Sequence, residues 1–253
     1  MNGSPTRRPL IFAHRGASAA LPEHTEEAYR RALDDGADGV ECDVRLTRDG
    51  HLICLHDRRL ERTSNGHGLV SDLTLAQLER LDFGSWHGTG PAPVLTLDRL
   101  LHTLRDAGRP VRLLIETKHP SRYGAEVEHR LVALLRRHGL ATTRGPVAVT
   151  VMSFSALALR RIRQLAPDLP TVLLLELLPP GLLPGRLPYA RIAGPSIALT
   201  RARPGLVPAL RATGNQIYLW TVNEPADLAL AVTHGAEGII TDRPAHALAH
   251  LDR

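Results

Sequence analysis

Short apolar segments alternate with amphipathic segments along most of the chain. The apolar segments predict eight strands, at residues 9–13, 39–44, 111–117, 147–154, 171–175, 196–200, 216–222 and 238–241. Between them, apolar positions at helical spacing predict helices at residues 25–35, 96–107, 125–138, 155–165, 204–212 and 225–234. Thr25 and Gly36 fit the two ends of the first helix, because threonine caps helix N-termini and glycine commonly follows C-termini.

Strands that alternate with helices in this way, about eight times in about 250 residues, predict a TIM barrel, an α/β fold with its active site at the carboxyl ends of the strands. An open doubly wound sheet is the alternative. Residues 57–95 interrupt the alternation and contain many of the residues typical of loops, five glycines and three serines among them. We expect them to form an insertion that follows an extra strand or hairpin at residues 51–56. With no long polar linker, residues 1–253 are expected to form one domain.

The composition narrows the class of protein. Hydrophobic residues make up 43% of the chain and aromatic residues only 4%, which excludes a disordered chain and predicts a core of Leu, Val, Ile and Ala. Two cysteines, Cys42 and Cys54, exclude a disulfide scaffold. We find no sequence pattern typical of a signal peptide. The most apolar stretch, 171–183, contains a glutamate and two prolines and is shorter than the roughly 20 residues of a membrane helix. We therefore expect a soluble, cytoplasmic protein without an integral membrane segment.

The net charge of +5 does not by itself indicate nucleic-acid binding, because the arginines are scattered along the chain rather than clustered with aromatic residues. We expect no nucleic-acid partner. Lys118 is the single lysine among 31 basic residues, the other 30 being arginines. A single lysine suggests a site where a compact ammonium group fits and a planar guanidinium does not. The alternative is that lysine stands at this position by chance.

Acidic residues recur at alternate positions on two predicted strands. Glu41 and Asp43 are two residues apart, so both point to one face, about 7 Å apart along the backbone. Glu116 and Lys118 share a face for the same reason. The outer face of a barrel strand must be apolar, which places these side chains inside or at the rim. Three carboxylates there favour a divalent cation, and oxygen ligands favour Mg²⁺ or Ca²⁺. A buried salt-bridge network with Arg15, Arg45 and Lys118 is the alternative. Cys42 points away from the acids and, with no C-x-x-C motif present, both cysteines are expected to be core thiols.

Two histidines fall at the predicted carboxyl ends of strands. His14 is followed by Arg15 and Gly16, and His56 is followed by Asp57. A histidine pair at a barrel mouth suits a reaction in which one oxygen loses a proton and another gains one. Arg15 adds a bidentate anion ligand and Lys118 a point charge. Together with a metal ion, these groups describe a site for a phosphoryl group.

An ordered set of motifs resembles the glycerophosphodiester phosphodiesterase family and spans almost the whole chain. The motifs are His14-Arg-Gly16, Pro22-Glu-His-Thr25, Glu41-Cys-Asp43, His56-Asp57, Arg62-Thr63, Leu114-Ile-Glu-Thr-Lys118, Ser153-Phe154, Trp220-Thr-Val-Asn223 and Thr241-Asp242. The resemblance implies a TIM barrel with a small insertion. It also implies hydrolysis of a glycerophosphodiester to glycerol 3-phosphate and an alcohol.

The resemblance also implies roles for individual residues. Glu41, Asp43 and Glu116 would hold one divalent cation, and His14 and His56 would be the general acid and base. The implied substrate-binding residues are Arg15 and Lys118 for the phosphate, Glu23 close to the metal or the glycerol hydroxyls, Trp220 as a wall of the pocket, and Asn223 as its support. The reaction would run either through a cyclic phosphate formed by a glycerol hydroxyl or by direct attack of water.

One residue departs from the family pattern, because His24 stands where the family usually has asparagine. An imidazole is bulkier than an amide, so this change puts the substrate preference in question. Three other functions are compatible with the same barrel. They are a phosphodiesterase acting on lysophospholipids, with residues 173–183 as an apolar patch at the mouth, a lyase that stops at the cyclic product, and a non-catalytic protein that binds a phosphorylated ligand.

Overall fold

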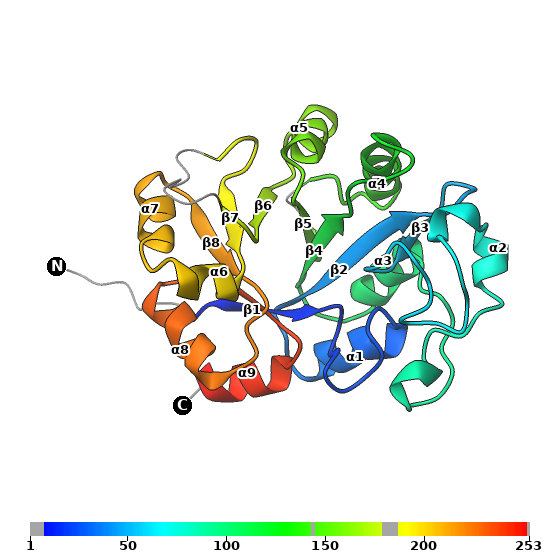
Figure 1. The fold of residues 1–253 in the computed structure, drawn as a ribbon, viewed down its shortest axis with the longest axis horizontal. Helices are drawn as coiled ribbons and strands as arrows, with labels where there is room; N and C mark the ends of the chain where they lie inside the picture. Colours follow the sequence, from blue (N-terminus) through cyan, green and yellow to red (C-terminus); the bar gives the residue numbers. More distant parts are fainter. Residues whose placement is uncertain (1–7, 143–144, 179–186, 252–253) are drawn as a thin grey trace.

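Eight parallel strands form a closed barrel in the computed structural model, which describes residues 8–142, 145–178 and 187–251 (Figure 1). The barrel strands are β1 (Leu10–His14), β2 (Gly39–Leu46), β4 (Val111–Thr117), β5 (Val147–Ser153), β6 (Thr171–Leu175), β7 (Ile192–Pro195), β8 (Gln216–Leu219) and β9 (Gly238–Thr241). Their order around the barrel is β1-β9-β8-β7-β6-β5-β4-β2, and β1 also pairs with β2. This second pairing closes the sheet, so the predicted TIM barrel is confirmed and an open doubly wound sheet is excluded.

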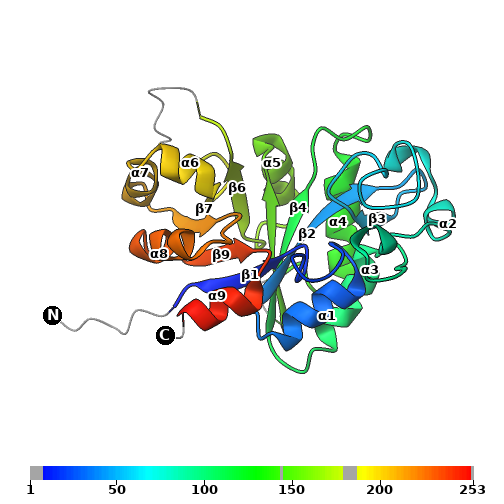
Figure 2. The ribbon, with the colours of Figure 1, turned by 60° about the horizontal axis from the view of Figure 1, so that its bottom comes forward.

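Helices surround the barrel, as Figures 1 and 2 show. They are α1 (Glu26–Asp34), α3 (Leu97–Arg105), α4 (Glu126–Arg137), α5 (Ala156–Leu165), α6 (Ile197–Ala202), α7 (Leu206–Ala212), α8 (Pro225–Thr233) and α9 (Pro244–Leu251). The predicted ends of the first helix are confirmed. The Thr25 side chain accepts a hydrogen bond from the Ala28 backbone nitrogen, and Gly36 follows the helix with a φ of +85°.

The alternation of side chains along each strand divides the core into two layers. Between the strands and the helices, residues such as Val40, Cys42 and Val44 pack in an outer layer. Inside the barrel lies a smaller apolar cluster formed by Phe12, Leu114, Met152, Val172, Leu174, Ile192, Tyr218 and Ile240. Glu41 and Asp43 alternate with the outer residues and therefore point inward, as their spacing predicts. Cys42 and Cys54 are buried and unpaired.

One predicted strand is wrong. Residues 196–200 do not form a strand, because the barrel strand ends at Pro195 and Ser196 begins helix α6. The Ser196 side chain accepts a hydrogen bond from the Leu199 backbone nitrogen, which is the ordinary geometry of a helix N-cap. The apolar and β-branched residues Ile197 and Thr200 suggested a strand, but both are buried on a short helix. Helix α9, which begins at a proline, was not predicted.

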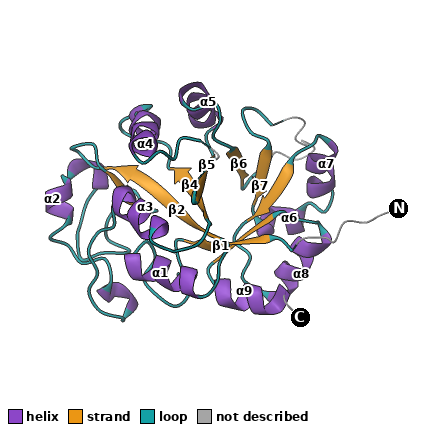
Figure 3. Ribbon diagram, turned by 180° about the vertical axis from the view of Figure 1, so that it is seen from behind, coloured by secondary structure: helices purple, strands orange, loops and turns teal. Residues whose placement is uncertain are grey.

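The segment between β2 and α3 contains the predicted extra strand and the insertion that follows it. The strand is β3 (Leu52–Cys54), which pairs antiparallel to β2, and the insertion contains the 3-10 helix η1 (Val70–Asp72), helix α2 (Leu75–Leu78) and the 3-10 helix η2 (Ser85–His87). Figure 3 shows α2 at the edge of the molecule, beyond β2. The insertion has an apolar cluster of its own, formed by Ile53, Leu55, Leu60, Val70, Leu78, Phe83 and Val94. It is therefore an ordered part of the fold that continues the sheet.

Among the helices in the described ranges, none has the length and the apolar character that crossing a lipid bilayer requires. The apolar stretch 171–183 begins with strand β6, in which Leu173, Leu174 and Leu175 are buried. Those leucines belong to the core and do not contribute to a surface patch at the mouth. Residues 179–183 of the stretch lie outside the described residues.

Gly39 at the start of β2 tests how tightly the barrel is packed. A methyl group on this residue would overlap the carbonyl oxygen of Arg112 and lie 2.9 Å from the Phe12 ring. We expect Gly39→Ala to lower the free energy of unfolding by about 2 kcal/mol, measured by urea denaturation, because a packed core resists added volume. Gly205→Ala is the control, since its methyl group would meet no atom within 4 Å. Equal losses in the two variants would contradict this description of the barrel.

Candidate active site

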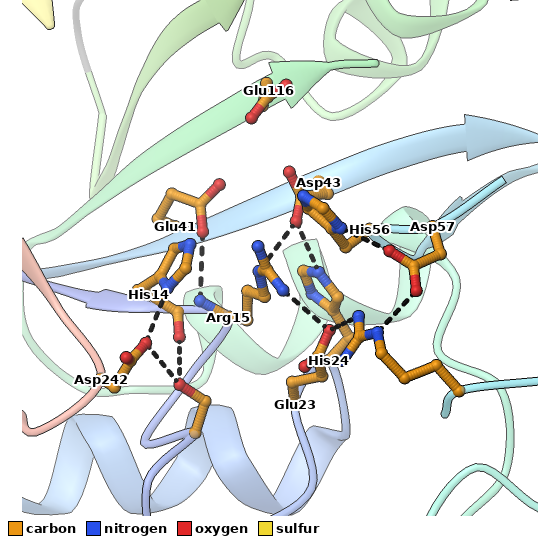
Figure 4. Close-up of polar contacts among 12 residues, drawn as sticks. His14, Arg15, Glu23, His24, Glu41, Asp43, His56, Asp57, Glu116 and Asp242 are labelled. Carbon is orange, nitrogen blue, oxygen red and sulfur yellow. Dashed lines mark hydrogen bonds and ion pairs between the residues drawn. The ribbon is translucent and has the colours of Figure 1, made fainter. Parts of the chain in front are cut away.

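Three carboxylates converge inside the mouth of the barrel. Glu41 and Asp43 come from β2 and Glu116 comes from β4, and the register places Asp43 beside Glu116. One oxygen from each lies within 4.8 Å of the others, and all three side chains are buried. Figure 4 shows the two residues of β2 on one strand with Glu116 on its neighbour. The structure thus brings together the three residues that were predicted to bind a metal.

Two cationic side chains touch this trio of carboxylates. Lys118 Nζ lies 2.8 Å from Glu116 Oε1 and 3.3 Å from Asp43 Oδ1. Arg15 donates its backbone N–H to Glu41 Oε2 at 3.1 Å, and its Nε lies 3.1 Å from Asp43 Oδ2. Arg45, the third cation of the salt-bridge alternative, instead donates from Nε and Nη2 to the His56 carbonyl oxygen, at 2.8 and 2.6 Å. Two of the three cations expected in such a network are therefore present in it.

The pKa values of the trio reflect its crowding. Burial, together with the charge of Asp43, raises the pKa of Glu41 well above its usual range. The same two causes raise the pKa of Glu116 to about 8, against the attraction of Lys118. Burial alone would also raise the pKa of Asp43, but the charge of Lys118 and the hydrogen bond from His24 hold it well below its usual range. The cationic and hydrogen-bonding partners of the trio therefore favour the ionised form most strongly at Asp43.

The trio has the size and the donor chemistry for one hard cation. Two oxygens on opposite sides of a Ca²⁺ ion lie about 4.6 to 5.2 Å apart, and around Mg²⁺ about 4.0 to 4.2 Å, since these are twice the usual bond lengths. The largest separation in the trio, 4.8 Å or less, is compatible with a single ion of this kind. All three ligand atoms are carboxylate oxygens, which Mg²⁺ and Ca²⁺ prefer.

His14 reaches the same cavity from the end of β1. The β1–β2 register pairs His14 with Glu41, and the chain after β9 places Asp242 next to it. His14 Nδ1 lies 2.7 Å from Asp242 Oδ1. Burial would raise the pKa of Asp242, but its hydrogen bonds with His14, Asn223 and Ser18 lower it to about 2. The ionised carboxylate accepts a hydrogen bond from Nδ1–H, so Nε2 is the nitrogen available to the cavity.

His56 is held in the same way by a different carboxylate. Its Nδ1 lies 2.6 Å from Asp57 Oδ1, and Arg62 donates from Nε to Asp57 Oδ2 at 2.5 Å. Burial lowers the pKa of His56. Burial would raise the pKa of Asp57, but the hydrogen bonds from Arg62 and His56 lower it to about 2.

Because β3 pairs with β2, the residues that follow β3 lie close to Asp43. Both imidazoles therefore line the cavity with Nδ1 bonded to a carboxylate.

Glu23 and Asn223 support the site from outside the cavity lining. Glu23 accepts hydrogen bonds from Arg15 at 3.0 Å and from both terminal nitrogens of Arg62 at 2.8 Å. Burial would raise the pKa of Glu23, but these arginines lower it to about 2. Asn223 donates from Nδ2 to Asp242 Oδ2 at 2.6 Å. Glu23 thus links the loop after β1 to the insertion, and Asn223 fixes the carboxylate behind His14.

His24, the departure from the family pattern, is buried beside the trio. Its Nε2 lies 3.0 Å from Asp43 Oδ2 and its Nδ1 lies 2.8 Å from the Tyr29 hydroxyl. The Tyr29 hydroxyl in turn donates to the Glu41 backbone oxygen at 3.2 Å. Burial lowers the pKa of His24. The imidazole therefore fixes the orientation of Asp43 and does not line the cavity.

A cavity of about 270 Å³ is lined by most of the predicted residues, whereas Asp43, Glu23 and Asn223 lie behind its lining. Its polar side is formed by His14, Arg15, Glu41, His56, Glu116 and Lys118, and its other side by Met152, Phe154, Leu174, Glu176, Trp220 and Ile240. The Trp220 ring meets the Phe154 ring edge to face, at 5.5 Å between centroids, and its Nε1 donates to the Gly194 carbonyl oxygen at 2.6 Å. A small molecule with one charged end and one carbon-rich end would fit this division.

Sequence reasoning assigned no role to several residues of the site. Asp57, Arg62 and Asp242 hold the two histidines, although all three occur in the motifs that carry the family resemblance. Of the apolar residues that line the cavity, Trp220 was the one assigned a role from the sequence. Strand parity could have found Met152 and Leu174, because each lies at an inward position just before the carboxyl end of its strand. Nothing in the sequence indicated that Glu176, one residue beyond β6, lines the cavity.

A barrel with acidic, basic and imidazole side chains at the carboxyl ends of its strands is the arrangement of a barrel enzyme. Residues 14–246 match the Glycerophosphoryl diester phosphodiesterase family. A probable glycerophosphodiester phosphodiesterase 1 of Mycobacterium tuberculosis is 48% identical, covering 96% of this chain and 93% of the relative. The glycerophosphodiester phosphodiesterase of Bacillus subtilis is 38% identical, covering 94% and 84%.

Solved structures show the same fold. The crystal structure of a glycerophosphodiester phosphodiesterase from Agrobacterium tumefaciens has a TM-score of 0.76 at 29% identity, covering 96% of this chain and 100% of that one. An Oleispira antarctica phosphodiesterase, solved in complex with the product sn-glycerol-3-phosphate, has a TM-score of 0.83 at 23% identity and 97% coverage of both chains. The chain therefore belongs to the glycerophosphodiester phosphodiesterase family and is a phosphoric diester hydrolase.

The supporting carboxylates predict how stability depends on pH. Glu23, Asp57 and Asp242 have folded pKa values of about 2, below their ordinary values of 4.5, 3.8 and 3.8. A lowered folded pKa stabilises the native state above the ordinary pKa, and this contribution is lost as the pH falls toward 2. We expect urea denaturation to show lower stability at pH 3 than at pH 5. The loss should be smaller in Asp242→Asn, and an identical loss in both proteins would contradict the role of Asp242.

Proposed function

We propose that the chain hydrolyses glycerophosphodiesters to glycerol 3-phosphate and an alcohol with one divalent cation and with His14 and His56 as general acid and base. One observation carries the proposal. A single cavity is lined by Glu41 and Glu116, whose carboxylate oxygens lie within 4.8 Å of each other and of one from Asp43, and by two imidazoles, each with Nδ1 bonded to a carboxylate. The names of the relatives at 48% and 38% identity support the substrate class.

Glu41, Asp43 and Glu116 would hold the cation, Mg²⁺ or Ca²⁺, which supplies positive charge to the phosphoryl oxygens when it is bound. Arg15 and Lys118 border the same cavity and would bind the phosphate oxygens. The guanidinium of Arg15 is already fixed by Glu23, so it would meet the phosphate without a large loss of side-chain entropy. The carbon skeleton of the substrate would lie against Trp220 on the apolar side.

The two histidines would move the protons of the reaction. One imidazole takes the proton of the attacking hydroxyl as the new oxygen–phosphorus bond forms, and the other gives a proton to the alcohol oxygen as its bond to phosphorus breaks. Asp242 and Asp57 keep the Nδ1 atoms protonated, so Nε2 of each ring is the exchanging nitrogen. The attacking hydroxyl is either that of the glycerol, which gives a cyclic phosphate that water then opens, or that of water itself.

An exposed apolar rim favours a second substrate, a lysophospholipid. Phe154 lines the cavity and is 42% exposed, and Leu177, just beyond Glu176, is 87% exposed. An acyl chain that left the cavity on this side would contact both residues. This alternative keeps the barrel, the metal ion and the histidines and changes only the group attached to the glycerol.

The central test is release of glycerol 3-phosphate. We expect the purified protein with Mg²⁺ or Ca²⁺ to form it from glycerophosphocholine, and a chelator to abolish the activity. Phosphorus NMR of the products distinguishes a hydrolase from a lyase, because a lyase accumulates the cyclic phosphate. Lysophosphatidylcholine in the same panel distinguishes the lipid substrate. A folded, metal-loaded protein that is inert on the whole panel would refute the proposal.

The histidines are tested by substitution. His14→Ala and His56→Ala should each lower kcat by roughly 10²-fold or more, since each removes one proton-transfer group. His129→Ala, an exposed histidine on α4, is the matched control and should keep full activity. A non-catalytic binding protein would show no turnover in the wild type and unchanged ligand affinity in both variants.

A further inference from the structure

A second group of metal-ligating side chains lies on the outside of the barrel, where α3 meets the end of α4. Asp98 and His102 are four residues apart on α3 and therefore share one face of that helix. His138 is the C-cap residue of α4. One possible ligand atom from each of the three residues lies within 4.8 Å of the others.

The three side chains are already oriented toward one another. His138 Nε2 lies 2.8 Å from Asp98 Oδ1, and His102 Nε2 lies 3.9 Å from Asp98 Oδ2. The two imidazole rings are 5.0 Å apart between centroids and inclined by 69°. An edge-to-face pair of this kind keeps the rings from stacking, so ring nitrogens from both can face a common point beside the carboxylate.

Two exposed side chains and one buried side chain could close on a small ion. Asp98 and His102 are 55% and 57% exposed, so both can turn without leaving a packed position. His138 is only 7% exposed and would be the fixed ligand. Its Nδ1 is buried and has no hydrogen-bond partner among the described residues, whereas its Nε2 already faces Asp98.

The surroundings favour a cation with access to water. His138 follows the last turn of α4, where the free carbonyl groups carry the negative end of the helix dipole. Asp98 also lines an open cavity of about 470 Å³, through which an ion could enter and a water molecule could complete the coordination. Two arginines line the same cavity: Arg130 donates to Glu126 and Arg137 is exposed.

We propose that Asp98, His102 and His138 bind one Zn²⁺ ion, with water as the fourth ligand, and that this ion joins α3 to α4. Two imidazole nitrogens and one carboxylate are a ligand set that zinc favours, with bonds of about 2.0 to 2.2 Å. The all-oxygen trio in the cavity suits Mg²⁺ or Ca²⁺ instead. The chain would thus have two metal sites that differ in ligand chemistry, one at the reaction centre and one on the outer surface.

The test is equilibrium dialysis of the full chain against Zn²⁺ in excess Mg²⁺, with zinc determined by metal analysis. His102→Ala and Asp98→Asn should each remove one bound zinc ion per chain or weaken its binding at least about tenfold. His129→Ala is the matched control, because it removes an exposed helical histidine outside the cluster. Diesterase activity should be unchanged in His102→Ala, so this result is independent of the proposed reaction.

A second measurement tests the joining of the helices. Zn²⁺ should raise the melting temperature of the wild type and of His129→Ala by a few degrees and should not raise that of His102→Ala, because an ion bound only to the folded state stabilises it. Equal zinc stoichiometry, affinity and thermal shift in all these proteins would overturn the proposal. Zinc bound only by the carboxylate trio would give that result.

Discussion

The burial of three carboxylates in one barrel mouth is the constraint on which the rest of the site depends. A carboxylate loses its hydration when it is buried, and this cost must be offset by positive charge and hydrogen bonds. Asp43 receives these from Lys118, Arg15 and His24, whereas the Glu41 side chain accepts a hydrogen bond from the Arg15 backbone N–H and otherwise depends on the charges around it. A bound cation would remove the remaining imbalance. The same crowding of buried carboxylates therefore makes the trio suitable for a metal ion.

Lysine at position 118 follows from the geometry of this trio. Its ammonium group contacts both Asp43 and Glu116 while it also borders the cavity. A planar guanidinium is larger and bonds best to a carboxylate edge on, so it would not occupy the same place between two carboxylates. Arg15 contacts Asp43 from the other carboxylate oxygen, and Arg62 lies further out. There, Arg62 can hold Glu23 on one side and Asp57 on the other.

The insertion and the two ends of the chain contribute to one preorganised site. Asp57 and Arg62 come from the beginning of the insertion, and Asp242 follows the last barrel strand. Each carboxylate fixes one histidine ring before any substrate is bound, which lowers the cost of reaching the reactive arrangement. His24 fixes Asp43 in a similar way, because its ring is hydrogen-bonded to Asp43 on one side and to the Tyr29 hydroxyl on the other. The residue that departs from the expected motif thus bonds Asp43 directly.

The sequence by itself determined the alternation of strands and helices, the inward direction of Glu41, Asp43 and Glu116, and the position of both histidines at strand ends. These properties are local, because side-chain parity and helix caps depend on neighbouring residues. Strand register and chain closure are not local, and only the tertiary structure decided them. They place His14 beside Glu41 and Asp242 and bring His56 to Asp43 through the pairing of β3. The prediction of a strand at residues 196–200 was wrong for a related reason. A short apolar segment can form a strand or a helix, and the elements packed against it decide which.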